Sequence, residues 1–216
     1  MATLILPDVG PLAPPYWMEA CRHLIKRDRV MKKLIPQHTG VSLQSRGDAF
    51  ATLARSIVGQ QISVKAAQSV WDRFAQLPQE MVPAQVLRLK VDDMRAAGLS
   101  ARKVEYLVDL ALHFANNQVH VDAWAEMDDE SIIRELVAIR GIGRWTAEMF
   151  LIFHLMRPNV LPLDDVGLQN GISRCYFSGE PVSRSEIREV AATWAPFCSV
   201  ATWYIWRSLD PAPVAY

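Results

Sequence analysis

The sequence around two adjacent carboxylates, Asp164 and Asp165, gives the strongest indication of a catalytic site. They follow an apolar stretch and precede an expected helix, and Asp165 lies 22 residues beyond Gly143. Because Gly141 and Gly143 are one residue apart, the backbone there can turn sharply and bring its amides close to another surface. The helix expected from Arg144 has first-turn N–H groups that favour an anion such as a DNA phosphate. These features together suggest DNA that is held by backbone amides and cut by a carboxylate.

Apolar residues recur with helical spacing along most of the sequence, and no strand-like alternation persists. Ile142, between the two glycines, is placed to insert into the core. Ser100, Asp128 and Ser183 are placed to cap helices, and Glu186 completes a capping box with Ser183. The expected helices are 16–27, 49–58, 63–76, 84–89, 92–97, 101–116, 129–139, 144–154, 166–176, 183–193 and 199–208. The sequence therefore predicts an all-α fold.

The charge balance argues against a nucleic-acid binder. The sequence has 23 Lys and Arg and 23 Asp and Glu, so its formal net charge is zero, whereas most nucleic-acid binders carry a basic excess. Local binding through hairpin amides and a few placed cations lessens this objection. The candidate cations are Lys65, Arg102, Lys103 and Arg144. Salt sensitivity should then be modest.

Cysteine usage and hydropathy indicate a soluble protein of a reduced, intracellular compartment. Cys21, Cys175 and Cys198 are far apart and form no Cys-x-x-Cys pair, so neither a zinc site nor a disulfide framework is indicated. No segment approaches the roughly 20 apolar residues needed to cross a bilayer, and the N-terminus does not read as a secretion signal. We expect a cytoplasmic protein without membrane contact, associated with the nucleoid if bacterial.

The hairpin is one of five short segments that follow one another along the sequence. The segments are 57–67 (IVGQQISVKAA), 100–103 (SARK), 141–148 (GIGRWTAE, the hairpin itself), 161–165 (LPLDD) and 203–207 (WYIWR). With these segments the sequence resembles the helix-hairpin-helix (HhH-GPD) superfamily of DNA glycosylases, and within it the 3-methyladenine DNA glycosylase II (AlkA) type. The resemblance runs from about Asp48 to the C-terminus. A Gly-x-Gly hairpin alone is weak evidence of DNA contact, but ordered segments in register are specific.

The resemblance implies a two-lobed helix-hairpin-helix glycosylase fold with DNA held between the lobes. One lobe would comprise residues 16–62 and 128–216 with the hairpin, and the other residues 63–127. Four prolines within residues 1–15 indicate an extended N-terminal arm. We therefore expect no N-terminal β domain of the kind that larger bacterial members add.

The resemblance makes Asp165 the catalytic residue. Positive charge builds on the sugar as a purine base departs, and a fixed carboxylate beside the sugar stabilises that charge. The same group can orient an attacking water. The alternative is that Asp164 and Asp165 only cap the next helix, which spacing alone favours. With the hairpin and the resemblance included, catalysis by Asp165 is the better interpretation, and Asp164 becomes the capping or orienting residue.

Trp145 lies two residues after Gly143, where the bifunctional members carry a lysine that attacks the sugar. Because tryptophan cannot form a Schiff base, the resemblance implies a monofunctional enzyme without lyase activity. Trp145, Met149 and Trp206 are expected to contact the flipped base, and indoles attract a cationic alkylated purine. Core packing is the alternative for both tryptophans. The family often has another aromatic residue where Met149 and Val166 stand, so we count Val166 with the pocket and expect a wider pocket here.

Gln60 and Gln61 occupy the turn where the resemblance places the side chain that fills the gap left by a flipped base. Gln61 is the expected filler and Gln60 is expected to hydrogen-bond the backbone, although an ordinary polar turn is the alternative. The other expected DNA contacts are Gly141, Gly143 and Thr146 through backbone amides, and Arg144 and Lys65 through their side chains. The carbonyls of Val137, Ile139 and Ile142 resemble the family's site for a structural monovalent cation.

The predicted function is base-excision repair of damaged double-stranded DNA. The enzyme would hydrolyse the N-glycosidic bond of alkylated purines, with 3-methyladenine as the first candidate and 7-methylguanine as a further one. The alternatives are a glycosylase for hypoxanthine or an etheno adduct, a non-catalytic DNA-binding module, and a purely structural helical bundle. We expect a monomer without a catalytic cofactor. We also expect no iron–sulfur cluster, since three cysteines cannot supply four ligands.

Overall fold

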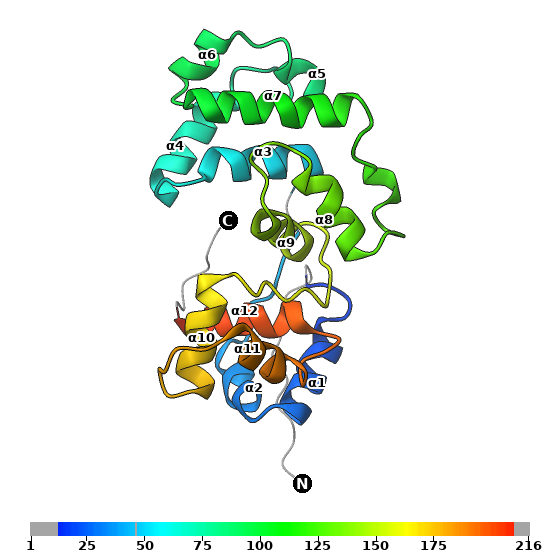
Figure 1. Ribbon diagram of the computed structural model, residues 1–216, viewed down its shortest axis with the longest axis vertical. Helices are drawn as coiled ribbons and strands as arrows, with labels where there is room; N and C mark the ends of the chain where they lie inside the picture. The colour runs from blue at the N-terminus through cyan, green and yellow to red at the C-terminus, as the bar shows by residue number, and fades with distance from the viewer. Residues whose placement is uncertain (1–12, 46, 210–216) are drawn as a thin grey trace. The chain divides into compact units, whose positions relative to one another are not determined.

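The computed structural model describes residues 13–45 and 47–209, and Figure 1 shows their helices. This part of the chain contains no strand, which confirms the predicted all-α fold. Its helices form two compact units. We call residues 1–45 with 151–216 the terminal unit, and residues 46–150 the middle unit.

The terminal unit is built around α12. Its helices are α1 (Trp17–Arg27), α2 (Arg29–Leu34), η1 (Ile35–Gln37), α10 (Val166–Tyr176), α11 (Arg184–Ala191) and α12 (Cys198–Leu209). Every residue of α12 from Cys198 to Arg207 is buried, because α10, α1 and α2 pack around it. Trp17 of α1 meets Trp203 of α12 edge to face, with ring centroids 5.1 Å apart. Aromatic packing of this kind fills the core of the unit.

Asp28 joins α1 to α2 and ties both to the rest of the terminal unit. Its extended backbone ends α1, and its Oδ1 accepts hydrogen bonds from the amides of Val30 (2.7 Å) and Met31 (3.0 Å). Its Oδ2 accepts from the Tyr176 hydroxyl (2.8 Å) and the Trp194 indole (3.0 Å). Burial and the adjacent carboxylate raise the pKa of Tyr176, so its hydroxyl stays a donor. One buried carboxylate therefore joins the start of α2 to α10 and to the segment that follows α11.

The middle unit packs around α7. Its helices are α3 (Ala49–Gly59), α4 (Val64–Phe74), α5 (Pro83–Val86), α6 (Val91–Ala96), α7 (Ala101–Ala115), η2 (Val121–Ala123) and α8 (Asp129–Val137). α7 lies against α3 and α5, and Phe50 of α3 meets Phe114 of α7 with ring centroids 5.4 Å apart. α9 (Arg144–Phe153) begins in the middle unit, and its last three residues belong to the terminal unit.

The two units do not follow the expected lobe boundaries. The sequence placed 16–62 and 128–216 together, but α3, α8 and the hairpin belong to the middle unit. α3 packs along α4 and α7, and this contact assigns it to the middle helices. Such a boundary depends on which apolar faces meet, and helical periodicity does not report that.

Most expected helices occur with similar bounds, and α10 occupies the residues predicted for it. Ser100, Asp128 and Ser183 cap their helices, and Ser183 and Glu186 form the predicted capping box. Three short elements, α2, η1 and η2, were not predicted because they are too short to show a period. The arm expected over residues 1–15 lies almost wholly outside the described residues. In the part of the chain that the structure describes, no helix has both the length and the apolar character that a membrane span requires.

Candidate nucleic-acid interface and catalytic carboxylate

The hairpin between α8 and α9 is held by one hydrogen bond of its own and by two from other parts of the middle unit. The amide of Ile142 donates to the Ile139 carbonyl (3.1 Å), and Ile142 is buried as predicted. Gln60 Nε2 donates to the carbonyl of Gly141 (2.8 Å), which confirms the predicted backbone hydrogen bond of Gln60. The Arg140 amide donates to Asp109 Oδ2 (2.8 Å). The hairpin backbone is therefore fixed before any ligand arrives.

The backbone conformation of the hairpin requires a glycine at position 141 but not at position 143. Gly141 has a φ of +86°, and a Cβ there would overlap the ring of Tyr106. We expect Gly141→Ala to lower the free energy of unfolding by about 2–4 kcal/mol, through backbone strain and overpacking. A Cβ at Gly143 meets nothing within 4 Å. Gly143→Ala should therefore cost about 1 kcal/mol or less in the same denaturant titration, and equal losses in the two variants would contradict this explanation.

Gln61 lies at the turn between α3 and α4 in a conformation that non-glycine residues seldom adopt. Its φ is +59° and its side chain is exposed. Two apolar neighbours are also exposed, Ile62 at 40% and Val64 at 70%. No functional role was predicted for Ile62 or Val64, although apolar residues on both sides of the capping Ser63 can be recognised in the sequence. Strain together with exposed apolar groups is typical of a loop shaped for a ligand.

The expected cations differ in availability. Lys65 and Arg102 are exposed. Lys103 Nζ donates to the Val58 carbonyl at the end of α3 (2.7 Å), and burial lowers the pKa of its ammonium group. Arg144 hydrogen-bonds Glu130 and also Glu148, at 2.9 Å between Nε and Oε1, so two carboxylates balance its charge. The hydrogen bond to Glu130 contributes most to raising the pKa of Arg144.

The first turn of α9 presents the other residues expected to contact DNA or the base. Gly143 and Trp145 are exposed, Trp145 at 39%, whereas Thr146 and Met149 are buried. The first backbone bond of α9 runs from the Ala147 amide to the Gly143 carbonyl (3.0 Å). The amides before it point along the helix axis, toward the exposed end, as helix geometry requires. Trp145 and Met149 are four residues apart and share one face of α9.

Asp165 lies in the terminal unit, where it is the N-cap of α10. Asp165 is buried, with 6% of its surface exposed. Oδ1 accepts hydrogen bonds from the Leu168 amide (2.6 Å) and from Trp206 Nε1 (2.7 Å). Both donors act on the same oxygen, so they fix the rotation of the carboxylate. Val166, the next residue, is 65% exposed.

Asp164 is not the capping residue that the sequence analysis expected. It is 52% exposed and forms an ion pair with Arg184. Asp165 itself caps the helix. Capping and catalysis by Asp165 are therefore compatible interpretations, because the hydrogen bond that caps α10 uses one oxygen and fixes the orientation of the carboxylate.

Trp206 holds this carboxylate from α12. Its indole stacks on Phe153, with ring centroids 5.7 Å apart and planes 11° from parallel. A Cβ at Gly167 would lie 3.0 Å from Asp165 Oδ1 and 3.1 Å from the indole, so glycine leaves room for their approach. Trp206 was predicted to line the base pocket, whereas no role was predicted for Phe153 or Gly167. The spacing of residues cannot show this hydrogen bond, because it joins segments 41 residues apart.

Trp206→Phe should slow base release about tenfold or more while leaving DNA affinity unchanged. The phenyl ring keeps the contact with Phe153 but cannot donate to Asp165, and a hydrogen bond to a charged group is worth about 1.5–3 kcal/mol. Single-turnover kinetics and a binding titration measure the two effects separately. Trp203→Phe removes an indole from the same helix without touching Asp165, so it serves as the control. Equal rates for the Trp206 and Trp203 variants would show that the indole only packs.

The three carbonyls expected to hold a monovalent cation lie in one turn, and carbonyl oxygens suit such an ion. One of them, Ile139, already accepts the Ile142 amide, so it would offer its second lone pair. Among the described residues, no group of three or more His, Cys, Asp and Glu side chains is placed to hold a metal ion.

Comparison with known proteins identifies the family. Residues 54–196 match the model of the HhH-GPD superfamily of base excision DNA repair proteins. DNA-3-methyladenine glycosylase 1 of Schizosaccharomyces pombe is 31% identical over 180 residues, which cover 82% of this chain and 79% of the relative. The chain spans 66% and 65% of the length of two Bacillus subtilis relatives.

Solved structures agree with this assignment. The crystal structure of DNA-3-methyladenine glycosidase from Bacillus halodurans is 33% identical, with a TM-score of 0.83 and coverage of 88% of this chain and 89% of that one. The S. pombe 3-methyladenine DNA glycosylase Mag1, solved in complex with abasic DNA, is 28% identical, with a TM-score of 0.75 and coverage of 92% and 100%. Sequence, fold and hairpin agree, and the chain belongs to the HhH-GPD superfamily of base excision DNA repair proteins.

Proposed function

We propose that this protein is a monofunctional DNA glycosylase that removes alkylated purines, 3-methyladenine first and 7-methylguanine as a further substrate. The observation that carries the proposal is the buried carboxylate of Asp165, held by two donors on one oxygen. The names of the S. pombe and B. halodurans relatives support the substrate class. The Mag1 complex with abasic DNA supports damaged duplex DNA as the partner. We propose that the protein acts as a monomer inside the cell.

The chemistry follows from the charge that develops as the base leaves. Departure of the purine leaves positive charge on the sugar, and the fixed carboxylate of Asp165 stabilises it. Asp165 also accepts a proton from the attacking water as the new C–O bond forms. An alkylated purine already carries positive charge, so it leaves without prior protonation. The products are the free base and an abasic site in an intact strand.

The residues of the hairpin and the α3–α4 turn hold the DNA in this proposal. The amides of Gly141, Gly143 and Thr146 bind a phosphate at the start of α9. Gln61 enters the gap left by the flipped nucleotide, and the strained backbone and the exposed Ile62 beside it support that role. Lys65 adds a cation. Because two carboxylates balance the charge of Arg144, the backbone amides contribute more to phosphate binding than this side chain does.

The remaining expected residues form the base pocket in this proposal. Trp145, Met149, Val166 and Trp206 contact the extruded base, and Trp145 stacks on it. Stacking of a base on an aromatic ring contributes about 1–3 kcal/mol. Trp145 cannot act as the amine nucleophile of a lyase, and this supports hydrolysis. We further propose that the carbonyls of Val137, Ile139 and Ile142 bind a monovalent cation that stiffens the hairpin.

The test is base release from duplex DNA treated with a methylating agent. The protein is incubated with the DNA, free bases are separated, and half of the DNA is then treated with alkali. We expect 3-methyladenine in the free fraction and strand breaks only after alkali. Breaks without alkali would show lyase activity and overturn the monofunctional assignment. If methylated bases stay on DNA that the protein binds, the substrate assignment is wrong, and hypoxanthine and etheno-adenine duplexes decide between another lesion and a binding module.

A further inference from the structure

Residues 22–33 concentrate positive charge in a protein with no net charge. Six of the 23 Lys and Arg lie there, and only one of the 23 Asp and Glu. The rest of the chain is left with 17 cations and 22 anions, so the segment is strongly basic on a mildly acidic molecule. The six residues are Arg22, Lys26, Arg27, Arg29, Lys32 and Lys33, which we call the basic surface.

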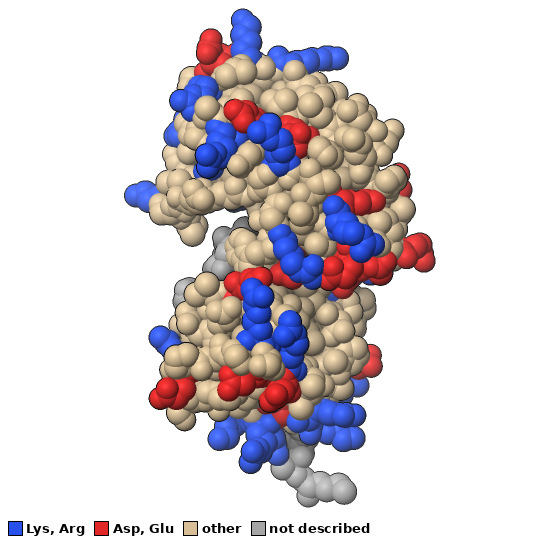
Figure 2. All heavy atoms as spheres, viewed as in Figure 1, with Lys and Arg blue, Asp and Glu red and all other residues tan. Residues whose placement is uncertain are grey.

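The basic surface is exposed and its charges are not compensated by ion pairs. All six side chains are exposed, and none forms an ion pair with another described residue. The one acid in the segment, Asp28, is buried, and its two oxygens face amides and side chains of the terminal unit. In Figure 2, Lys and Arg side chains gather where Figure 1 shows α1 and α2. Uncompensated charge of this density attracts a polyanion.

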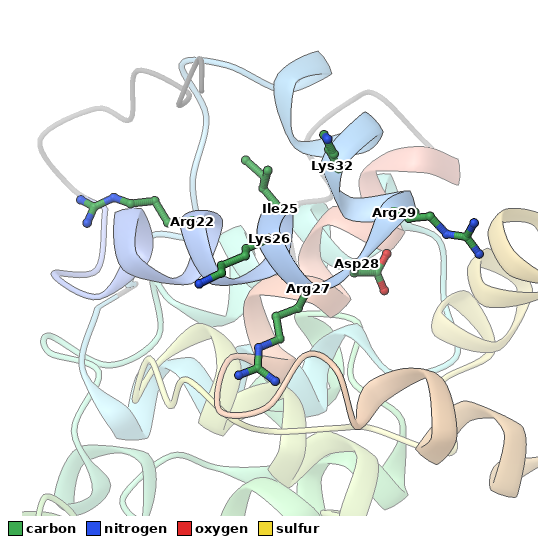
Figure 3. Close-up of a pocket in the computed structure, with 7 residues that line it drawn as sticks. All are labelled: Arg22, Ile25, Lys26, Arg27, Asp28, Arg29 and Lys32. Atoms are coloured by element: carbon green, nitrogen blue, oxygen red, sulfur yellow. The ribbon is translucent and has the colours of Figure 1, made fainter. Parts of the chain in front are cut away.

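The arrangement of the side chains favours an extended ligand over a small one. Five of the six cations line an open cavity of about 550 Å³ along α1 and α2. Figure 3 shows Arg22, Arg27 and Arg29 extending away from the helices in different directions, and they do not converge on one point. A single phosphate is normally held by converging donors. Cations spread along two helices fit phosphates spread along a nucleic-acid backbone.

The composition of the surface favours a nucleic acid over a protein partner. No residue between 22 and 33 belongs to the large apolar side chains that the described part of the chain exposes. Protein interfaces depend on a few buried apolar or aromatic anchors, whereas DNA backbone contacts depend on Lys and Arg. Ile25, the apolar residue of the cavity wall, is only 6% exposed.

The basic surface lies at the other end of α10 from the candidate catalytic carboxylate. Asp165 caps the N-terminal end of α10, and Tyr176 at its C-terminal end donates to Asp28 within the basic segment. α10 has 11 residues, which correspond to about 16 Å of helix. A duplex engaged at Asp165 therefore meets one end of this helix, and Asp28, within the basic segment, contacts the other.

We propose that the basic surface binds the phosphate backbone of a second segment of duplex DNA while the damaged segment is engaged at Asp165. The proposal rests on the proposed function, because it takes duplex DNA as the partner and Asp165 as the place where the damaged segment is engaged. Two duplex sites let the protein pass between DNA segments without full release. They would also let a chain with zero net charge bind DNA, because the binding charge is local.

The experiment uses the full chain and two short duplexes that carry a fluorescence donor and acceptor. The donor duplex contains a stable abasic analogue, and the acceptor duplex is undamaged. We expect wild-type protein to bring the two together and produce energy transfer that falls steeply with salt. The variant Arg22→Gln/Lys26→Gln/Arg29→Gln should reduce formation of this ternary complex on the order of tenfold or more, since each lost phosphate contact removes about one unit of salt slope.

A matched variant separates local charge from total charge. Arg88→Gln/Lys90→Gln/Arg188→Gln removes the same charge from exposed positions elsewhere and should keep wild-type energy transfer. Absence of energy transfer with wild type, or equal transfer with both triple variants, overturns the proposal. Single-turnover release of 3-methyladenine is measured in parallel and should be the same in all three proteins. Absence of base release in wild type would instead refute the proposed function, and the energy-transfer result would still decide the second site.

Discussion

Asp165→Asn is expected to slow base release by about 100- to 1000-fold, the usual effect of removing one well-placed electrostatic group. Asparagine has nearly the same shape and can still accept the Leu168 amide, so the cap of α10 and the stability should be retained. The carboxamide is neutral, so it cannot stabilise the positive charge that develops on the sugar as a carboxylate does. Single-turnover release of 3-methyladenine from a saturating duplex measures the loss, and a thermal scan confirms folding.

Asp164→Asn is the matched control for this change. Asp164 is the adjacent carboxylate, but it is 52% exposed and paired with Arg184. Asp164→Asn removes the same charge one residue away. The rate of base release should stay within about twofold of wild type, since an exposed ion pair contributes little to stability. Wild-type activity in the Asp165 variant would show that this residue only caps the helix. An equal loss in both variants would mean that general charge, rather than the fixed carboxylate, drives the reaction.

Asp28→Ala is expected to lower the free energy of unfolding by about 3–5 kcal/mol. Alanine removes the cap of α2 and leaves the indole N–H of Trp194 and the hydroxyl of Tyr176 without their acceptor. A lost cap costs about 1 kcal/mol and each buried unsatisfied group about 1–3 kcal/mol. Denaturant unfolding at equilibrium measures the change.

Asp48→Ala isolates the capping contribution. Asp48 also caps a helix, by accepting the Ala51 amide (3.0 Å), but it is exposed and has no buried side chain as a partner among the residues that the structure describes. Its substitution should cost about 1 kcal/mol. If Asp28→Ala costs no more than Asp48→Ala, the buried hydrogen bonds to Tyr176 and Trp194 do not stabilise the terminal unit as argued.

The N-cap position of Asp165 is compatible with the catalytic role that we propose for this residue. A helix N-cap must accept an amide with one oxygen, and this fixes the side chain in one orientation. Trp206 adds a second donor to the same oxygen. Such fixed orientation is what electrostatic stabilisation requires, because a mobile carboxylate would have to reorganise during the reaction. The capping role of Asp165 would therefore favour the catalytic role that we propose for it.

Local patterns were sufficient for the elements and for the position of the hairpin. Helical apolar spacing predicted α10 to the residue and α9 to within one residue, and the caps at Ser100, Asp128 and Ser183 followed from side chains that bond amides three residues away. The buried Ile142 between two glycines was also foreseen. These features involve neighbours along the chain, so their physical causes are visible in sequence.

Long-range contacts decided the rest. Patterns along the chain predicted the longer helices, the family, and the acidic and hairpin residues. The tertiary structure was needed to show that Trp206 donates to Asp165, that Glu130 and Glu148 balance Arg144, and that α3 joins the middle unit. It also decided that Asp28 is buried while six neighbouring cations remain exposed. A hydrogen bond or a buried face depends on which distant segments meet, and the spacing of residues along the chain does not record that.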